Sequence, residues 1–105
     1  MSAILQGTTP KLEITVPESV PLDSVTGIEL TMKHRGQKMI YGMSDVTVDT
    51  EANTITYSFT EAQTMAMDPR QDLIWQLRLK NATGIVGTLP AAIRVYDLIS
   101  EVLMG

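Results

Sequence analysis

Short runs in which apolar and polar residues alternate are the feature of this sequence that most restricts its fold. The clearest run is residues 73–80, which places apolar side chains from Leu73 to Leu79 on one face and polar ones on the other. Residues 11–16 follow the same period. Alternation of this kind is typical of a β-strand with one buried face. The expected strands are residues 11–16, 28–34, 38–41, 46–48, 55–59, 73–80, 85–87 and 92–96.

One segment departs from the two-residue period. Thr60 is followed three residues later by Gln63, which is the spacing of a capping box at the start of a helix. Pro69 ends any helix, because the residue before a proline disfavours the helical region. The sequence therefore predicts one short helical turn near residues 61–67. The tail, residues 98–103, is compatible with either a strand end or a short helix.

Many short strands, separated by turns every 8–12 residues, predict an all-β fold built from two antiparallel sheets. The even spacing of the strands, without long helices between them, argues against a parallel α/β sheet. We expect about seven or eight strands and the one helical turn. A chain of 105 residues has room for one domain, so residues 1–105 are expected to form a single β-sandwich.

Composition excludes several classes of protein. The chain has no cysteine, which excludes disulfides, thiolate metal sites and cysteine nucleophiles. Its net charge of −4 disfavours a general nucleic-acid binder. The longest apolar runs are only a few residues, so no membrane insertion is expected. The first nine residues lack the features of a Sec signal, so we expect no secretion by that route.

Candidate catalytic residues are few. His34 is the one histidine, and no nucleophile or metal partner lies in a recognisable motif around it, so it is interpreted as a solvated strand-end residue. Asp45, Asp49 and Glu51 cluster near one hairpin, but they lack the spacing of a calcium loop and are better explained as turn formers. The chain is therefore expected not to be an enzyme, and to hold neither a cofactor nor a metal.

Seven methionines are many for this length. Methionine either fills core gaps or forms an adaptable binding surface. We expect core filling at Met32, Met39 and Met65, which lie in or beside the expected elements. An intersubunit contact is the alternative for those near turns or the tail: Met43, Met67 and Met104.

Other residues point to contacts with a partner. Tyr96 is out of phase with its apolar neighbours, so it is expected to face outward, where it can anchor a partner. Arg35 lies in a small basic hairpin of an otherwise acidic chain, which suits docking to an acidic surface or is simply solvated. The candidate partner contacts are Met43, Tyr96, Arg35 and Met104.

The order of these segments resembles a family. Its features are a short leader, a hairpin, a helical turn, a tryptophan strand and a closing strand: residues 4–10, 46–57, 59–64, 75–78 and 93–97. This succession resembles the small immunoglobulin-like domains encoded by phages and prophages of Gram-positive bacteria. They are similar to the N-terminal domain of the siphophage baseplate upper protein. The resemblance extends over residues 4–103 and carries no active-site motif.

The resemblance implies an immunoglobulin-like sandwich with a structural role in a tail or baseplate. Its partners are then proteins of a phage particle, or further copies of the chain itself. Such domains belong to longer proteins, and a chain ending at Gly105 departs from that arrangement. We therefore expect either a separate small virion protein or an accessory factor. A carbohydrate-binding module is the alternative function, although five aromatic residues are few for a sugar site.

Overall fold

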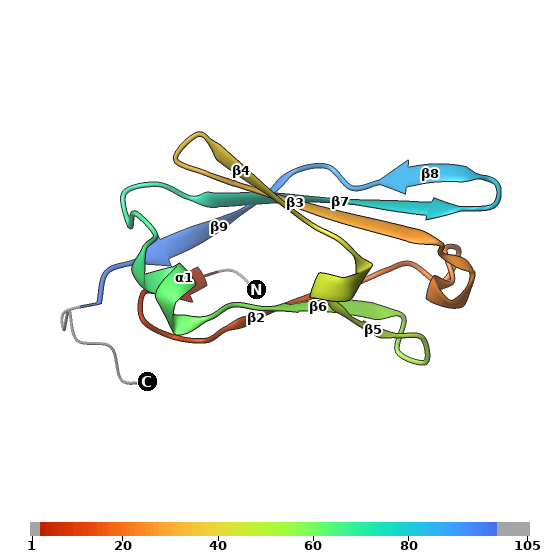
Figure 1. The fold of residues 1–105 in the computed structure, drawn as a ribbon, viewed down its shortest axis with the longest axis horizontal. Helices are drawn as coiled ribbons and strands as arrows, with labels where there is room; N and C mark the ends of the chain where they lie inside the picture. Colours follow the sequence, from red (N-terminus) through yellow and green to blue (C-terminus); the bar gives the residue numbers. More distant parts are fainter. Residues whose placement is uncertain (1–2, 99–105) are drawn as a thin grey trace.

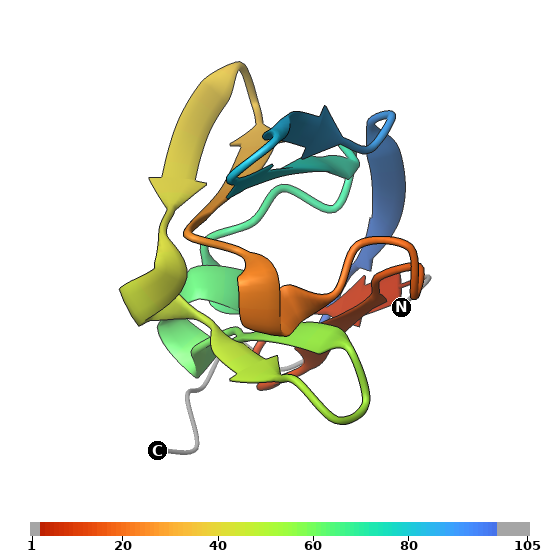
Figure 2. The same cartoon turned by 90° about the vertical axis from the view of Figure 1, so that its right-hand side faces the viewer.

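The computed structural model describes residues 3–98, and these form two facing β-sheets (Figures 1 and 2). The larger sheet has six strands in the order β1-β9-β7-β3-β4, with β8 also paired to β7. They are Ala3–Leu5 (β1), Gly27–His34 (β3), Gln37–Tyr41 (β4), Leu73–Asn81 (β7), Gly84–Gly87 (β8) and Ala91–Tyr96 (β9). The smaller sheet has the order β2-β6-β5. Its strands are Lys11–Thr15 (β2), Thr47–Asp49 (β5) and Thr54–Ser58 (β6).

Strands β8 and β9 occupy one position in the larger sheet. Both run antiparallel to β7, and β3 already occupies the other edge of β7. They are thus one strand, interrupted by a segment that contains Pro90. With this strand counted once, the order β9-β7-β3-β4 over β2-β6-β5 is that of an immunoglobulin-like sandwich. The predicted all-β sandwich is confirmed.

The strand β1 was not predicted. It pairs parallel to β9, with Ile4 opposite Val95, and the Ile4 side chain is completely buried. A strand of three residues is too short to show a period of two in the sequence. The leader is therefore part of the larger sheet, where it covers the outer edge of β9.

The core lies between the two sheets and follows the predicted alternation. In β7, Leu73, Leu77 and Leu79 are buried, and Trp75 is partly buried against them. Each buried leucine contributes about 1.5–3 kcal/mol by leaving water. The other fully buried large side chains of the two sheets are Ile4, Leu12, Leu30, Met32, Ile55, Ile93 and Val95.

The helical turn forms where the capping box predicts it, although it is shorter than expected. The Oγ1 of Thr60 accepts a hydrogen bond from the Gln63 amide at 3.1 Å, and the Gln63 Oε1 accepts one from the Thr60 amide at 2.8 Å. These bonds begin α1, Glu61–Met65. Two 3-10 turns complete the described chain, η1 at Leu22–Ser24 and η2 at Met43–Asp45. No helix in residues 3–98 is long and apolar enough to span a membrane.

Asn53 joins two loops at one end of the sandwich, the β5–β6 turn and the β2–β3 connection (Figure 2). Its Nδ2 donates to the carbonyl oxygens of Val16, Pro17 and Val20 at 2.8, 3.1 and 3.3 Å. Its Oδ1 accepts from the Leu22 amide at 2.9 Å. The backbone φ of Asn53 is +56°, a left-handed conformation that asparagine tolerates better than most residues. One side chain thus fixes the end of the smaller sheet.

Candidate interaction surface

The outward face of the larger sheet is basic, although the chain as a whole is acidic. The strand register turns five of the eight lysine and arginine side chains to this face. They are Lys33, Lys38, Arg78, Lys80 and Arg94, and all are exposed. Among the described residues, Glu29 is the one acidic residue that a strand presents there. We call these outward positions of β1, β3, β4, β7, β8 and β9 the basic face.

Glu29 neutralises one of these cations. The Arg78 Nε donates to Glu29 Oε1 at 3.0 Å, and the Arg78 Nη2 donates to Oε2 at 2.9 Å. These bonds lower the pKa of Glu29, so its carboxylate stays charged well below neutral pH. Lys33, Lys38 and Lys80 have no ion-pair partner among residues 3–98. The basic face therefore keeps a positive charge that no acidic residue within 3–98 balances by an ion pair.

Large apolar side chains lie among these cations. Ile40 is 65% exposed and Ile85 is 62% exposed, and three more are about half exposed: Leu5, Ile74 and Tyr96. The Arg94 guanidinium lies 5.7 Å from the centre of the Tyr96 ring, which holds the ring over the sheet. A contiguous surface of this mixed composition is typical of a protein–protein contact, in which aromatic and aliphatic groups lie beside charged ones.

The predicted partner contacts do not form one cluster. Tyr96 faces outward as predicted and belongs to the basic face. Arg35 is exposed in the β3–β4 turn, where its φ is +55°. Met43 is 45% exposed in η2, on the connection from β4 to the smaller sheet. Met104 lies outside the described residues. Lys33 and Lys38 belong to the basic hairpin that the sequence indicates around Arg35. The gathering of Arg78, Lys80 and Arg94 on the same face was not predicted, because alternation alone does not tell which strands become neighbours.

Two predictions about the methionines are wrong. Met39 was expected in the core but is 40% exposed, because β4 is an edge strand. Met67 was expected near a contact but is buried, because the chain after α1 turns back under the β3–β4 hairpin. Met32 is buried as predicted, and Met65 is partly buried.

A hollow of about 250 Å³ lies between β4 and α1. Methionines, aromatic rings and polar side chains line it, including the predicted contact Arg35. The lining residues are Met32, His34, Arg35, Gln37, Met39, Tyr41, Phe59, Gln63, Ala66 and Met67. The rings of Tyr41 and Tyr57 lie 4.5 Å apart, and those of Tyr57 and Phe59 lie 5.0 Å apart. The Gln63 Nε2 donates to the Tyr57 hydroxyl at 2.8 Å. The hollow is large enough for an apolar side chain of a partner, and its adaptable methionines suit such a contact.

Tyr41 in this hollow predicts a loss of stability at high pH. Burial raises the pKa of Tyr41 to about 12, and the nearby Tyr57 hydroxyl adds to the shift. Below pH 10 the Tyr41 hydroxyl keeps its proton in both the folded and the unfolded chain, so its contribution to the free energy of unfolding is fully present. Between pH 10 and pH 12 the unfolded chain loses it more readily, so the free energy of unfolding falls as pH rises. Urea midpoints across this range measure the effect.

The matched control is Tyr41→Phe, which removes the ionising group and keeps the ring. Its urea midpoint is expected to fall less than that of the unmodified chain between pH 10 and pH 12. Equal falls in the two proteins would show that Tyr41 ionises as readily in the folded chain as in the unfolded one.

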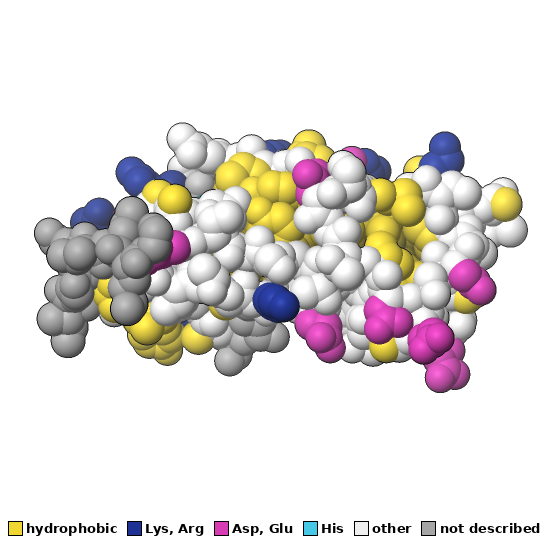
Figure 3. All heavy atoms as spheres, turned by 60° about the horizontal axis from the view of Figure 1, so that its bottom comes forward, with side chains coloured by type: hydrophobic (Ala, Val, Ile, Leu, Met, Phe, Trp, Pro, Cys, Tyr) yellow, Lys and Arg dark blue, Asp and Glu magenta, His cyan; other side chains and the backbone are white. Residues whose placement is uncertain are grey.

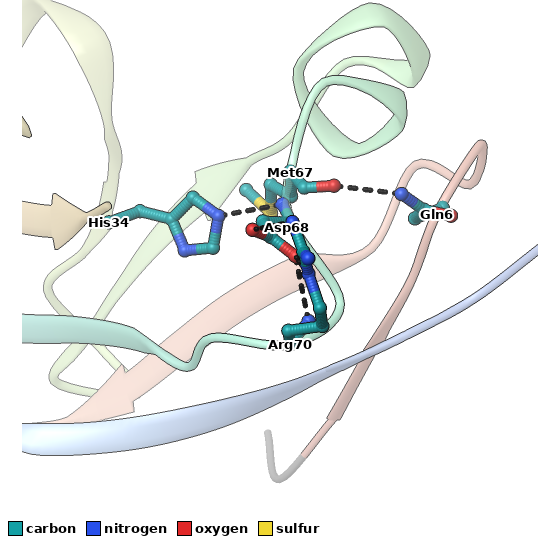
Figure 4. Close-up of polar contacts among 5 residues, drawn as sticks. All are labelled: Gln6, His34, Met67, Asp68 and Arg70. Carbon is teal, nitrogen blue, oxygen red and sulfur yellow. Dashed lines mark hydrogen bonds and ion pairs between the residues drawn. The ribbon is translucent and has the colours of Figure 1, made fainter.

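His34 is buried, so its interpretation as a solvated residue is wrong. Its Nε2 accepts a hydrogen bond from the Asp68 amide at 2.8 Å, which leaves the proton on Nδ1 to be donated to the Asp72 carbonyl oxygen at 3.2 Å (Figure 4). The same loop is held from its other side by the Gln6 Nε2, which donates to the Met67 carbonyl oxygen at 2.7 Å. His34 therefore fastens the loop after α1 to β3.

The acidic residues near the β5–β6 hairpin serve the turns. The Asp49 Oδ1 accepts hydrogen bonds from the Glu51 and Ala52 amides, both at 3.0 Å. The Asp45 Oδ2 accepts one from the Gly42 amide at 2.9 Å. Within residues 3–98, no group of three or more histidine, aspartate or glutamate side chains is placed to hold a metal ion.

The strand order defines the chain as an all-β sandwich of immunoglobulin-like topology. A scan against models of known protein families finds no match, and a search of curated proteins finds no relative. A β-sandwich supports many unrelated functions, so the function of this chain has to be inferred from its own surface.

Proposed function

We propose that this chain is a non-catalytic structural or assembly protein encoded by a phage or prophage. It is associated with a tail or baseplate, and it acts through protein–protein contacts. The observation that carries the proposal is the basic face, where uncompensated lysines surround exposed isoleucines and Tyr96. The exposed apolar side chains are costly to leave in water, and the lysines around them suit a protein partner of opposite charge.

The resemblance of the sequence to phage immunoglobulin-like domains supports the tail or baseplate role. That resemblance implies an immunoglobulin-like sandwich, and the chain has this strand order. The fold is shared by proteins of many functions, so it supports the proposal without distinguishing a phage protein from other binding modules. The chain is made in the cytoplasm, and then it enters the particle.

The environment of His34 supports a non-catalytic role. Both of its ring nitrogens are engaged by backbone groups, the Asp68 amide and the Asp72 carbonyl. A general base needs a ring nitrogen that can reach the proton of a substrate. His34 instead acts in the structure of the loop, as the hydrogen bonds to both sides of the ring suggest.

Co-purification with the products of neighbouring genes tests the proposal. We expect the tagged chain to retain at least one tail or baseplate protein, and mass spectrometry to find the chain in purified particles. The double variant Lys33→Glu/Lys38→Glu is expected to lose at least tenfold in partner binding, because it reverses two adjacent charges of the basic face. Lys11→Glu, on the other sheet, is the control and is expected to retain the partner.

Two outcomes would count against the proposed function. A chain that retains no product of a neighbouring gene and is absent from particles would contradict the proposal. Selective binding on a glycan array, lost on replacing Tyr41 or Tyr96, would instead favour the carbohydrate-binding alternative.

A further inference from the structure

The outward face of the smaller sheet has the opposite charge to the basic face. On its strands the exposed charged residues are Lys11, Glu13 and Asp49. The adjoining turns add Glu18, Asp23 and Glu51, all exposed and held in the loops that Asn53 joins. Figure 3 shows acidic side chains gathered at one end of this side of the molecule. We call this surface, with its turns, the acidic face.

Short polar side chains lie between the charges of the acidic face. The register of β2, β6 and β5 turns four threonines outward, Thr15, Thr47, Thr54 and Thr56. The two faces are therefore opposite in charge, and they lie on opposite sides of the same sandwich.

We propose that the basic face binds the acidic face of a second copy of this chain. The inference rests on the proposed function, because it names the occupant of the surface on which that function depends. Charge complementarity is the argument for a second copy: one chain carries both the unbalanced lysines and the matching carboxylates. The contact is head-to-tail, so a pair of copies leaves one basic face and one acidic face open, and repetition produces a ring or a filament.

The size of the contact predicts its strength. The smaller sheet has two strands of five residues and one of three. It covers at most about 14 Å by 17 Å, which with the turns is smaller than one side of a standard stable interface. A single contact is therefore weak and depends on charge. Screening reaches about 10 Å at 0.1 M salt, so attraction between the faces falls steeply with ionic strength.

Light scattering across a concentration series tests the contact. In 50 mM salt we expect the average mass to rise above one chain as concentration increases, and in 0.5 M salt we expect it to return to one chain. A mass of one chain at all concentrations in low salt would overturn the inference. Association that is indifferent to salt would overturn it as well, since the contact would not then depend on charge.

Charge reversals on the two faces distinguish them. Lys33→Glu/Lys38→Glu removes the attraction and is expected to abolish association. Lys11→Glu makes the acidic face more acidic and is expected to strengthen association. Both changes make the net charge more negative, so weakening by both would indicate general repulsion and would overturn the inference. Circular dichroism melts check that each variant is folded.

The strictest test of the contact is a mixture of two variants. Glu13→Lys/Glu51→Lys removes the net negative charge of the acidic face, and by itself this variant is expected to remain a single chain, as is Lys33→Glu/Lys38→Glu. In a mixture, the unaltered basic face of the lysine variant meets the unaltered acidic face of the glutamate variant, so association is expected to return. A mixture that stays as single chains would overturn the inference.

The outcomes also separate this inference from the proposed function. One outcome is that the unmodified chain remains monomeric while the Lys33→Glu/Lys38→Glu variant no longer binds a protein encoded by a neighbouring gene. In that case the proposed function stands, and the inference that a second copy occupies the basic face is wrong. If the chain stays single and a labelled DNA oligonucleotide binds the unmodified chain but not this variant, the partner is a nucleic acid and both are wrong.

Discussion

Replacing Asn53 by alanine is expected to lower the free energy of unfolding by about 3 kcal/mol. The side chain makes four hydrogen bonds to the backbone of residues 16–22, and all four are lost. The carbonyl and amide groups left behind are partly shielded from water and have no other side chain at that position. Alanine also adopts the left-handed φ of +56° less readily than asparagine does.

Two further variants separate these causes. Asn53→Gly relieves the backbone and still loses the hydrogen bonds, so it is expected to be less destabilising than alanine by about 1 kcal/mol. Asn53→Asp keeps the acceptor for the Leu22 amide and loses the three donated bonds. Urea unfolding followed by Trp75 fluorescence measures all three. A stability of Asn53→Ala within 0.5 kcal/mol of the unmodified chain, on the order of a neutral surface change, would contradict the role of Asn53.

Replacing His34 by alanine is expected to cost about 2–3 kcal/mol. The buried ring is lost, and the Asp68 amide and Asp72 carbonyl lose their partner. Because His34 fastens the loop after α1 to β3, amide exchange of that loop is expected to rise more than exchange elsewhere. Urea unfolding and hydrogen exchange measure the two effects.

His34→Phe is the matched control, since it fills the same space without the two hydrogen bonds. It is expected to recover part of the stability and none of the protection of the Asp68 amide. Partner binding by either variant is expected to be unchanged under conditions in which it is folded. A specific loss of binding or of an activity with unchanged stability would show that His34 acts on a ligand.

The sequence predicted the strands well where they are long. Side chains of a strand alternate between its two faces, so Leu73, Leu77 and Leu79 of β7 were expected on one buried face. The structure buries all three. The capping box at Thr60 and Gln63 correctly predicted the start of α1. It is visible in the sequence because its hydrogen bonds join residues only three positions apart. β1 escaped notice because three residues show no period.

What the sequence did not predict depends on neighbours distant in the chain. The partners of His34 lie 34 and 38 residues away, and those of Asn53 lie more than 30 residues away. Alternation assigns Lys33 and Lys80 to outward positions, but it does not say that β3 and β7 pair. The basic face became visible only with the strand order, so of the predicted contacts only Tyr96 belongs to it.

Lysine reactivity in the assembled state tests the central claim, that the basic face is where this chain binds. Acetylation followed by mass spectrometry compares each lysine in the isolated chain and in its complex. The account predicts that Lys33, Lys38 and Lys80 lose most of their reactivity on assembly. Unchanged reactivity of these three lysines in a complex that still contains the chain would contradict it.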